Sequence, residues 1–224
     1  VAKLGRKITD VVKHKVGGVK TDDPEYWGLK EVLTDEMVDL GNRMKLRQFY
    51  DFDQMMTLAP EIEPAHLQEL LDEMSVIGIL EYDYGDHYND DGPIADAPRI
   101  KRWRLPFFVP GSAELFNSSK DRIDKNPPVA NFFERMTFIP LAGITQMVPP
   151  GGDGIGMHVM PVEEAVNFQN EAVKLERISY WLKKYEGHIA AGICSCRYSR
   201  TTLGEGCADD PDDWCIQVGD MADY

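Results

Sequence analysis

The four cysteines of this 224-residue chain all lie between positions 194 and 215. They are Cys194, Cys196, Cys207 and Cys215, in the spacing C-x-C-x10-C-x7-C. Hydrophobic residues make up 43% of the chain, so it can bury a core and does not depend on disulfides for stability. A compact set of thiols in such a chain predicts a metal site, with two disulfides as the alternative.

The spacing of the cysteines helps to distinguish between metals. Structural zinc sites usually carry two C-x2–4-C pairs, whereas this segment has one C-x-C pair and two single cysteines. A [4Fe–4S] cluster is a larger object that needs four thiolates spread around it, although the C-x2-C-x2-C run of many ferredoxins is absent too. Gly204 and Gly206 would let the backbone approach such a cluster closely. The spacing therefore favours an iron–sulfur cluster, and a structural zinc ion is the alternative.

The formal net charge of −14 constrains the partners of the chain. A surface of this sign repels the phosphates of nucleic acids and of anionic membranes. No apolar run approaches the roughly 20 residues that span a bilayer, and the first residues are basic without the apolar stretch of a signal peptide. We therefore expect a cytoplasmic protein with reduced thiols and no membrane partner.

The first part of the sequence predicts an arm and then a helix. Residues 1–23 are basic, contain glycine and show no clear period, so they are expected to form an N-terminal arm. Pro24 suits the first position of a helix, and apolar residues then recur at helical spacing as far as Met44. The members of this stripe are Trp27, Val32, Leu33, Met37, Leu40 and Met44. The pattern predicts one helix over residues 24–44.

Two further helices and a pair of strands follow in the sequence. Asp51 is a candidate N-cap for a short helix. Residues 64–77 carry an apolar stripe of leucines and a methionine, and Gly78 is the stop signal. Segments 79–84 and 99–108 alternate like strands on either side of a long polar loop. The predicted order is helix, short helix, helix and two-stranded ribbon.

This order over residues 24–108, together with the phrase LLDEMSVIGILEY, resembles a winged-helix domain. Such domains often bind DNA through the third helix, but here that helix is acidic and has no Lys or Arg. Four cations surround Trp103 in the second strand, namely Arg99, Lys101, Arg102 and Arg104. They are interpreted either as phosphate contacts or as cations that face solvent or the protein's own acids. The acidic helix favours a packing or docking role and argues against nucleic acid as a partner.

The rest of the sequence predicts a linker and a second domain. Residues 109–160 are rich in proline and glycine and are expected to be a linker with a short helix at 129–136. Residues 161–185 have the apolar stripe of a long helix, and a strand then leads to Cys194. Residues 161–224 would form a small α/β iron–sulfur-binding domain. The predicted fold class is α+β, with the winged-helix-like domain before the cysteine domain.

Several stretches of the sequence point to a known family: EYWGLKEVLTDEM, FVPGSAE, GGDGIGMHVMPVEEAV, WLKKYEG, CSCRYSR and GEGCADDPDDWCIQVGDMADY. Together they resemble the N-terminal region of anaerobic iron–sulfur flavoproteins, which are pyridine nucleotide-disulfide oxidoreductase-like proteins with ferredoxin-type clusters. The resemblance covers nearly the whole chain and is most specific in the cysteine segment. It implies that Cys194, Cys196, Cys207 and Cys215 bind one [4Fe–4S] cluster and that the chain transfers electrons within a flavin-containing redox assembly.

The resemblance also implies a flavoprotein or ferredoxin-type redox partner, or a downstream domain. FAD and NAD(P) would bind there, because these residues contain no Rossmann fingerprint. The chain would then belong to an oxidoreductase system without a complete active site of its own. Two other functions stand beside electron transfer, a winged-helix regulator that senses redox state and a zinc-stabilised interaction module. His188, close before the cysteines, is interpreted as an ordinary strand-end histidine in preference to a group that touches the cluster.

Overall fold

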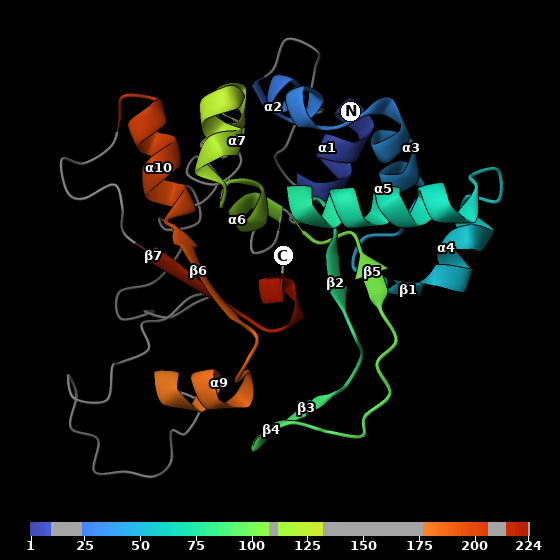
Figure 1. Ribbon diagram of the computed structural model, residues 1–224. Coiled ribbons are helices and arrows are strands. Elements are labelled where there is room, and N and C mark those ends of the chain that lie inside the picture. Colours follow the sequence, from blue (N-terminus) through green and yellow to red (C-terminus); the bar gives the residue numbers. More distant parts are fainter. Residues whose placement is uncertain (10–23, 108–111, 132–176, 206–213, 224) are drawn as a thin grey trace, which may run out of the picture.

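The computed structural model describes residues 1–9, 24–107, 112–131, 177–205 and 214–223. Helices and strands both contribute to it, so the predicted α+β class is confirmed. Figure 1 shows the first helices gathered above a small sheet, with a separate two-stranded ribbon beside them. Within the described ranges, no helix is both long and apolar enough to cross a bilayer.

The helix predicted over 24–44 is in fact two helices, α2 (Pro24–Val32) and α3 (Asp35–Arg43). The break falls at Thr34, whose backbone is extended and whose Oγ1 accepts a hydrogen bond from the Met37 N–H at 3.2 Å. A hydroxyl in this position is an N-cap, which starts a new helix. The prediction of a single helix was wrong because the apolar spacing continues across the break.

Helix α1 (Ala2–Thr9) stands where the first part of the arm was expected. Leu4 and Ile8 are fully buried in the same hydrophobic cluster as the helices that follow. The Nζ of Lys7 donates at 2.7 to 3.2 Å to three main-chain oxygens at the end of α3, those of Gly41, Asn42 and Met44. A lysine in this position satisfies carbonyls at a helix C-terminus, and burial lowers the pKa of its amine. Residues 10–23 lie outside the described residues.

Helices α4 (Phe52–Leu58) and α5 (Pro64–Ile77) confirm the predicted second and third helices. Asp51 caps α4 in a capping box, in which its carboxylate accepts the Gln54 N–H at 2.9 Å and the Gln54 side chain accepts the Asp51 N–H at 3.0 Å. Gly78 ends α5 with a left-handed backbone (φ +89°), as its place after the apolar stripe predicts.

Three short strands form an antiparallel sheet in the order β1-β5-β2: β1 (Tyr50–Asp51), β2 (Glu81–Asp83) and β5 (Arg102–Arg104). Trp103, in the middle of β5, lies opposite Tyr50 on one side and Tyr82 on the other. All three aromatic side chains are buried. The sheet thus supplies the lower layer of the core, and the helices supply the upper one (Figure 1).

Between β2 and β5 the chain runs out into a hairpin, β3 (Tyr88–Asn89) and β4 (Gly92–Pro93). We call residues 84–101, which carry this hairpin, the hairpin arm. Figure 1 shows it leaving the sheet on the side away from α5 and reaching toward the C-terminal part of the chain.

Two short helices occupy part of the expected linker, α6 (Ala113–Phe116) and α7 (Lys120–Lys125). Phe116 and Ile123 are fully buried and belong to the same hydrophobic cluster as the N-terminal helices. Residues 128–131 are helical as well, at the position of the short helix predicted at 129–136, most of which falls outside the described residues. The N-terminal core therefore extends well beyond the last strand of the sheet.

Helix α9 (Ile178–Lys184) is the described part of the helix expected over 161–185. Residues 161–176 lie outside the described residues. Arg177 is extended (φ −98°, ψ 128°) and precedes α9 without a side-chain capping bond. The expectation of a continuous helix through Arg177 is therefore wrong, because an apolar stripe identifies a buried face and does not reveal where the backbone changes conformation.

The C-terminal ribbon consists of β6 (Ile189–Ile193) and β7 (Trp214–Val218), antiparallel over five residue pairs. Helix α10 (Ser195–Thr202) follows β6 directly, and the 3-10 turn η3 (Asp220–Asp223) follows β7. The predicted strand before the first cysteine is confirmed. Figure 1 shows the ribbon between α10 on one side and the three-stranded sheet on the other.

Candidate functional site

The β6–β7 ribbon brings two of the four predicted cluster ligands to one place. Cys215 lies in β7 directly opposite Gly192 of β6, and Cys194 comes two residues after Gly192. Side chains alternate between the two faces of a strand, so positions 192 and 194 share a face. Directly opposed residues also share a face, so Cys194 and Cys215 lie on the same face at the same end of the ribbon.

Cys196 belongs to the helix that starts at this end of the ribbon. Cys194 is the N-cap of α10, with no side-chain capping bond, and Cys196 is the second residue of the helix. Both cysteines are half-buried, whereas Cys215 is exposed. Ser199 of α10 donates its hydroxyl to Asn117 Oδ1 at 3.2 Å, and both residues are fully buried. This contact fixes α10, and hence the C-x-C pair, against the end of α6.

Cys207 lies outside the described residues, so the structure places three of the four predicted ligands. In the part of the chain that is described, no three His, Cys, Asp or Glu side chains are gathered as metal ligands. A Cβ at Gly192 would be in ordinary contact with Ser118 O at 3.9 Å, and one at Gly204 would meet nothing within 4 Å. Thiolates are the donors that a four-thiolate cluster takes, and the three described cysteines alone do not close a site.

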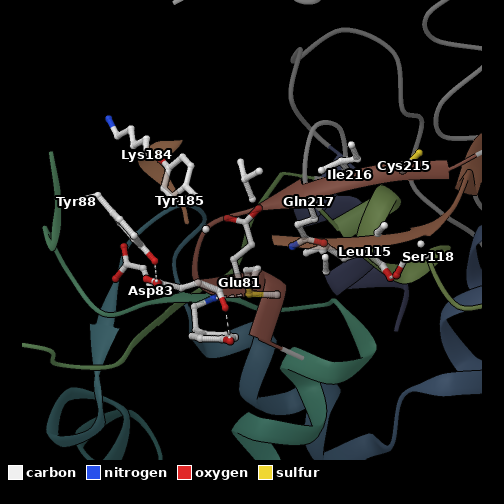
Figure 2. Close-up of a pocket in the computed structure, with 18 of the residues that line it drawn as sticks. Glu81, Asp83, Tyr88, Leu115, Ser118, Lys184, Tyr185, Cys215, Ile216 and Gln217 are labelled. Atoms are coloured by element: carbon white, nitrogen blue, oxygen red, sulfur yellow. Dashed lines mark hydrogen bonds between the residues drawn. The ribbon is translucent and has the colours of Figure 1, made fainter. Parts of the chain in front are cut away.

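A cleft of about 990 Å³ separates the three-stranded sheet from the ribbon. Figure 2 shows Cys215 at one end of it and the ring pair Tyr88 and Tyr185 at the other, with Glu81 and Asp83 of β2 in the opposite wall. A cleft of this size is in the range of ligand-binding pockets. Cys215 therefore faces a hollow that a partner group can enter.

A buried polar network around Asp220 holds the far end of the ribbon, and nothing in the sequence pattern predicted it. The Asp220 carboxylate accepts hydrogen bonds at 2.9 Å from the Tyr84 main-chain N–H and from the Tyr88 hydroxyl. His87 Nε2 lies 2.9 Å from the same carboxylate, and the His87 side chain is fully buried. His87 Nδ1 lies 2.9 Å from Gly85 O, and because a carbonyl only accepts, Nδ1 carries a proton.

Tyr88 links this network to the aromatic end of the cleft. Its ring centroid lies 4.1 Å from that of His87 and 4.7 Å from that of Tyr185. Burial, helped by the hydrogen bond to Asp220, raises the pKa of the Tyr88 hydroxyl well above its usual value. The hydroxyl therefore stays protonated and remains a donor to Asp220 throughout the neutral range.

His188 lies where a strand-end histidine was predicted, one residue before β6. Its Nδ1 is 2.9 Å from a carboxylate oxygen of Asp223, and its main-chain oxygen accepts the Gly219 N–H at 3.0 Å. The ring also packs edge-on against Tyr88, with 5.9 Å between the centroids. His188 thus closes the base of the ribbon, at the end opposite the thiols.

Three of the four cations around Trp103 face the protein's own carboxylates. The ion pairs join Lys101 to Asp72, Arg102 to Asp83 and Arg104 to Glu81, at 2.5 to 2.8 Å. Arg102 binds its partner with two nitrogens, at 2.8 and 2.9 Å. These contacts agree with the interpretation of the strand as self-paired and leave little uncompensated positive charge for phosphates.

Comparisons of the chain with models of protein families, with curated proteins and with solved structures found no match. The family resemblance of the sequence therefore stays a prediction.

Proposed function

We propose that the chain carries one [4Fe–4S] cluster on Cys194, Cys196, Cys207 and Cys215. Its function would be to exchange single electrons with a flavin-containing oxidoreductase or a ferredoxin-type partner. The register of the ribbon carries this proposal, because it puts Cys194 and Cys215 on one face beside the start of α10. Four thiolates are the usual ligand set of such a cluster, which supplies a one-electron redox centre when bound.

The surroundings of the thiols support electron exchange with a partner, in preference to catalysis within this chain. Cys215 is exposed and lines the cleft, so a partner can approach the site from solvent. FAD and NAD(P) belong to that partner or to a further domain, because the sequence has no dinucleotide-binding fingerprint. A reducing cytoplasm without oxygen is the setting that suits an exposed thiolate site.

We also infer that residues 24–108 are a winged-helix-like module in which the hairpin arm is the wing. The order α3, β1, α4, α5, β2, β5 and the sheet order β1-β5-β2 support this. A role in docking fits better than DNA binding, because α5 carries no Lys or Arg and the cations of β5 are paired with carboxylates.

The proposal is tested by measuring iron, acid-labile sulfide and zinc in protein purified without oxygen, together with the visible spectrum. We expect about four iron and four sulfide per chain and a brown colour that bleaches on reduction. Replacing Cys194, Cys207 or Cys215 with Ser should remove or degrade the cluster. Gln217→Ala is the matched control, because Gln217 lies in the same strand two residues from Cys215 and has no thiol.

Two results would overturn the proposal. About one zinc per chain without sulfide would make the four thiols a structural site and favour the zinc-stabilised interaction module. Full iron and sulfide in the Cys215→Ser protein would remove Cys215 from the ligand set. Loss of the cluster in Gln217→Ala as well would mean that the Cys→Ser effects report on folding of the ribbon.

A further inference from the structure

The position of Cys215 depends on the register of an unusually small sheet. A two-stranded ribbon alone is at best marginally stable in water. Because side chains alternate along a strand, a slip of one residue between β6 and β7 would move Cys215 to the opposite face from Cys194. A protein that uses both thiols together therefore needs a device that fixes this register.

The base of the ribbon is fixed to the edge of the three-stranded sheet. Among the described residues, strand β2 pairs only with β5, so its outer edge has no strand partner there. The outward N–H groups of Tyr82 and Tyr84 donate to Met221 Sδ at 3.1 Å and to Asp220 Oδ2 at 2.9 Å. Two side chains of η3 thus satisfy the edge that a further strand would otherwise occupy.

Asp220 makes most of this attachment, and it does so in a buried setting. Besides the Tyr84 N–H, its carboxylate accepts a hydrogen bond from the Tyr88 hydroxyl and lies next to His87 Nε2. Its main-chain oxygen accepts a hydrogen bond from the Tyr82 hydroxyl. Asp220 is 7% exposed and His87 is 0% exposed. Removal of the carboxylate would leave two partly buried donors, the Tyr84 N–H and the Tyr88 hydroxyl, without this acceptor, which costs more than the loss of an exposed bond.

The hairpin arm also contacts α9, the helix that precedes the ribbon. Tyr180 of α9 donates its hydroxyl to Asp90 at the tip of the hairpin at 2.7 Å. Tyr185, at the end of α9, packs edge-on against Tyr88 of β3. The hairpin arm is therefore in contact with the protein's own C-terminal segment.

We propose that the hairpin arm is an internal clamp for the cysteine ribbon and that Asp220 is a positioning residue for Cys215. Asp220 docks the end of β7 on a rigid sheet and so fixes which residue of β7 lies opposite Gly192. What Cys215 then binds rests on the proposed function, whereas the clamp itself does not. The proposal assigns the arm an intramolecular partner, the segment from α9 to η3.

The first test uses the metal-free chain of 224 residues and hydrogen exchange measured by mass spectrometry. In Asp220→Ala, exchange at residues 214–218 and at Tyr82 and Tyr84 should rise about 10- to 100-fold, with α5 unchanged. Alkylation of Cys215 should accelerate in parallel. Asp220→Asn should recover much of the protection, because its side-chain oxygen can still accept the Tyr84 N–H.

Two further variants keep this test decisive. Asp223→Asn is the matched control, because Asp223 lies in the same turn and an Asn side-chain oxygen can still accept a hydrogen bond from His188 Nδ1, which lies 2.9 Å from Asp223. It should leave exchange in the ribbon unchanged. Tyr88→Phe removes one donor to Asp220 and should give a smaller change in the same residues if Asp220→Ala proves too unstable to study. Unchanged ribbon exchange in Asp220→Ala, or an equal rise in every helix, would overturn the clamp.

The second test separates the clamp from the proposed function. If wild-type protein takes up iron and sulfide, Asp220→Ala should shift the reduction potential or the electron paramagnetic resonance signal, and Asp220→Asn should restore it. If wild-type protein binds no iron while Asp220→Ala still loosens the ribbon, the cluster proposal fails and the clamp stands. A cluster that is unchanged in a loosened ribbon would show that Asp220 does not position Cys215.

Discussion

A single glycine shows how closely the N-terminal core and the segment after it are packed. Gly78 has φ +89°, and a Cβ there would lie 2.5 Å from Leu115 Cβ and 2.8 Å from Phe116 N. We predict that Gly78→Ala lowers the free energy of unfolding by about 3 kcal/mol, because left-handed strain and overpacking add. Urea denaturation followed by circular dichroism measures the loss.

Gly187→Ala is the matched control for that variant. Gly187 has nearly the same backbone conformation (φ +85°), but a Cβ there would meet nothing within 4 Å. It should cost about 1 kcal/mol, the strain alone. Equal losses at the two positions would contradict the view that α6 presses on the end of α5.

At the scale of elements, α3 and α5 are joined at the surface by a titratable pair. His66 Nε2 lies 2.8 Å from Glu36 Oε2, and this hydrogen bond with the attached charge raises the pKa of His66 above its usual value. A raised folded-state pKa means that the stabilisation is complete below the unfolded value of about 6.5. It is lost as pH rises through the folded value.

Nuclear magnetic resonance titration of the His66 ring measures this effect. We predict a midpoint above that of an unperturbed histidine, and a lower midpoint in Glu36→Gln. Glu69→Gln is the control, because Glu69 lies 3.9 Å from the other ring nitrogen and contributes less. If the His66 midpoint is unchanged in Glu36→Gln but falls in Glu69→Gln, the pair between α3 and α5 does not form in solution.

Elements were predictable from the sequence where their signals are local. Asp51 and Gln54 cap α4 within four residues of chain, and Gly78 ends α5 by its own conformation. The break at Thr34 was missed because Thr34 is a weaker signal than the apolar stripe that runs across it. Helix α1 was missed because its two core residues, Leu4 and Ile8, stand among basic residues and glycine.

At the scale of the whole molecule, the candidate site was predictable only in part. The cysteines were found because thiols are chemically distinctive and close in sequence. Asp220 was not, because its partners lie 132 to 138 positions earlier in the chain and only folding brings them together. The cleft was not predictable either, because its two walls, the sheet and the C-terminal ribbon, are far apart in the sequence.

Arg122, in α7, connects the N-terminal core to the segment that supports α10. Its guanidinium donates at 2.7 to 2.9 Å to the main-chain oxygens of Val76 and Ile77 at the end of α5 and of Phe116 at the end of α6. Burial lowers the pKa of this guanidinium. Helix α7, which carries Arg122, also supports α10 through the Tyr198 hydroxyl, which donates to Asp124.

We therefore predict that Arg122→Ala lowers the free energy of unfolding by about 2 kcal/mol, because three helix-end carbonyls lose a charged donor. Hydrogen exchange should also rise in α10, because α7, which contacts α10, loses the hydrogen bonds that hold it to the ends of α5 and α6. Lys125→Ala, an exposed position on the same helix, should change stability by no more than about 0.5 kcal/mol. If Arg122→Ala destabilises α5 and leaves α10 unchanged, the cysteine pair is held by the ribbon alone, and the N-terminal core does not reach the proposed cluster through α7.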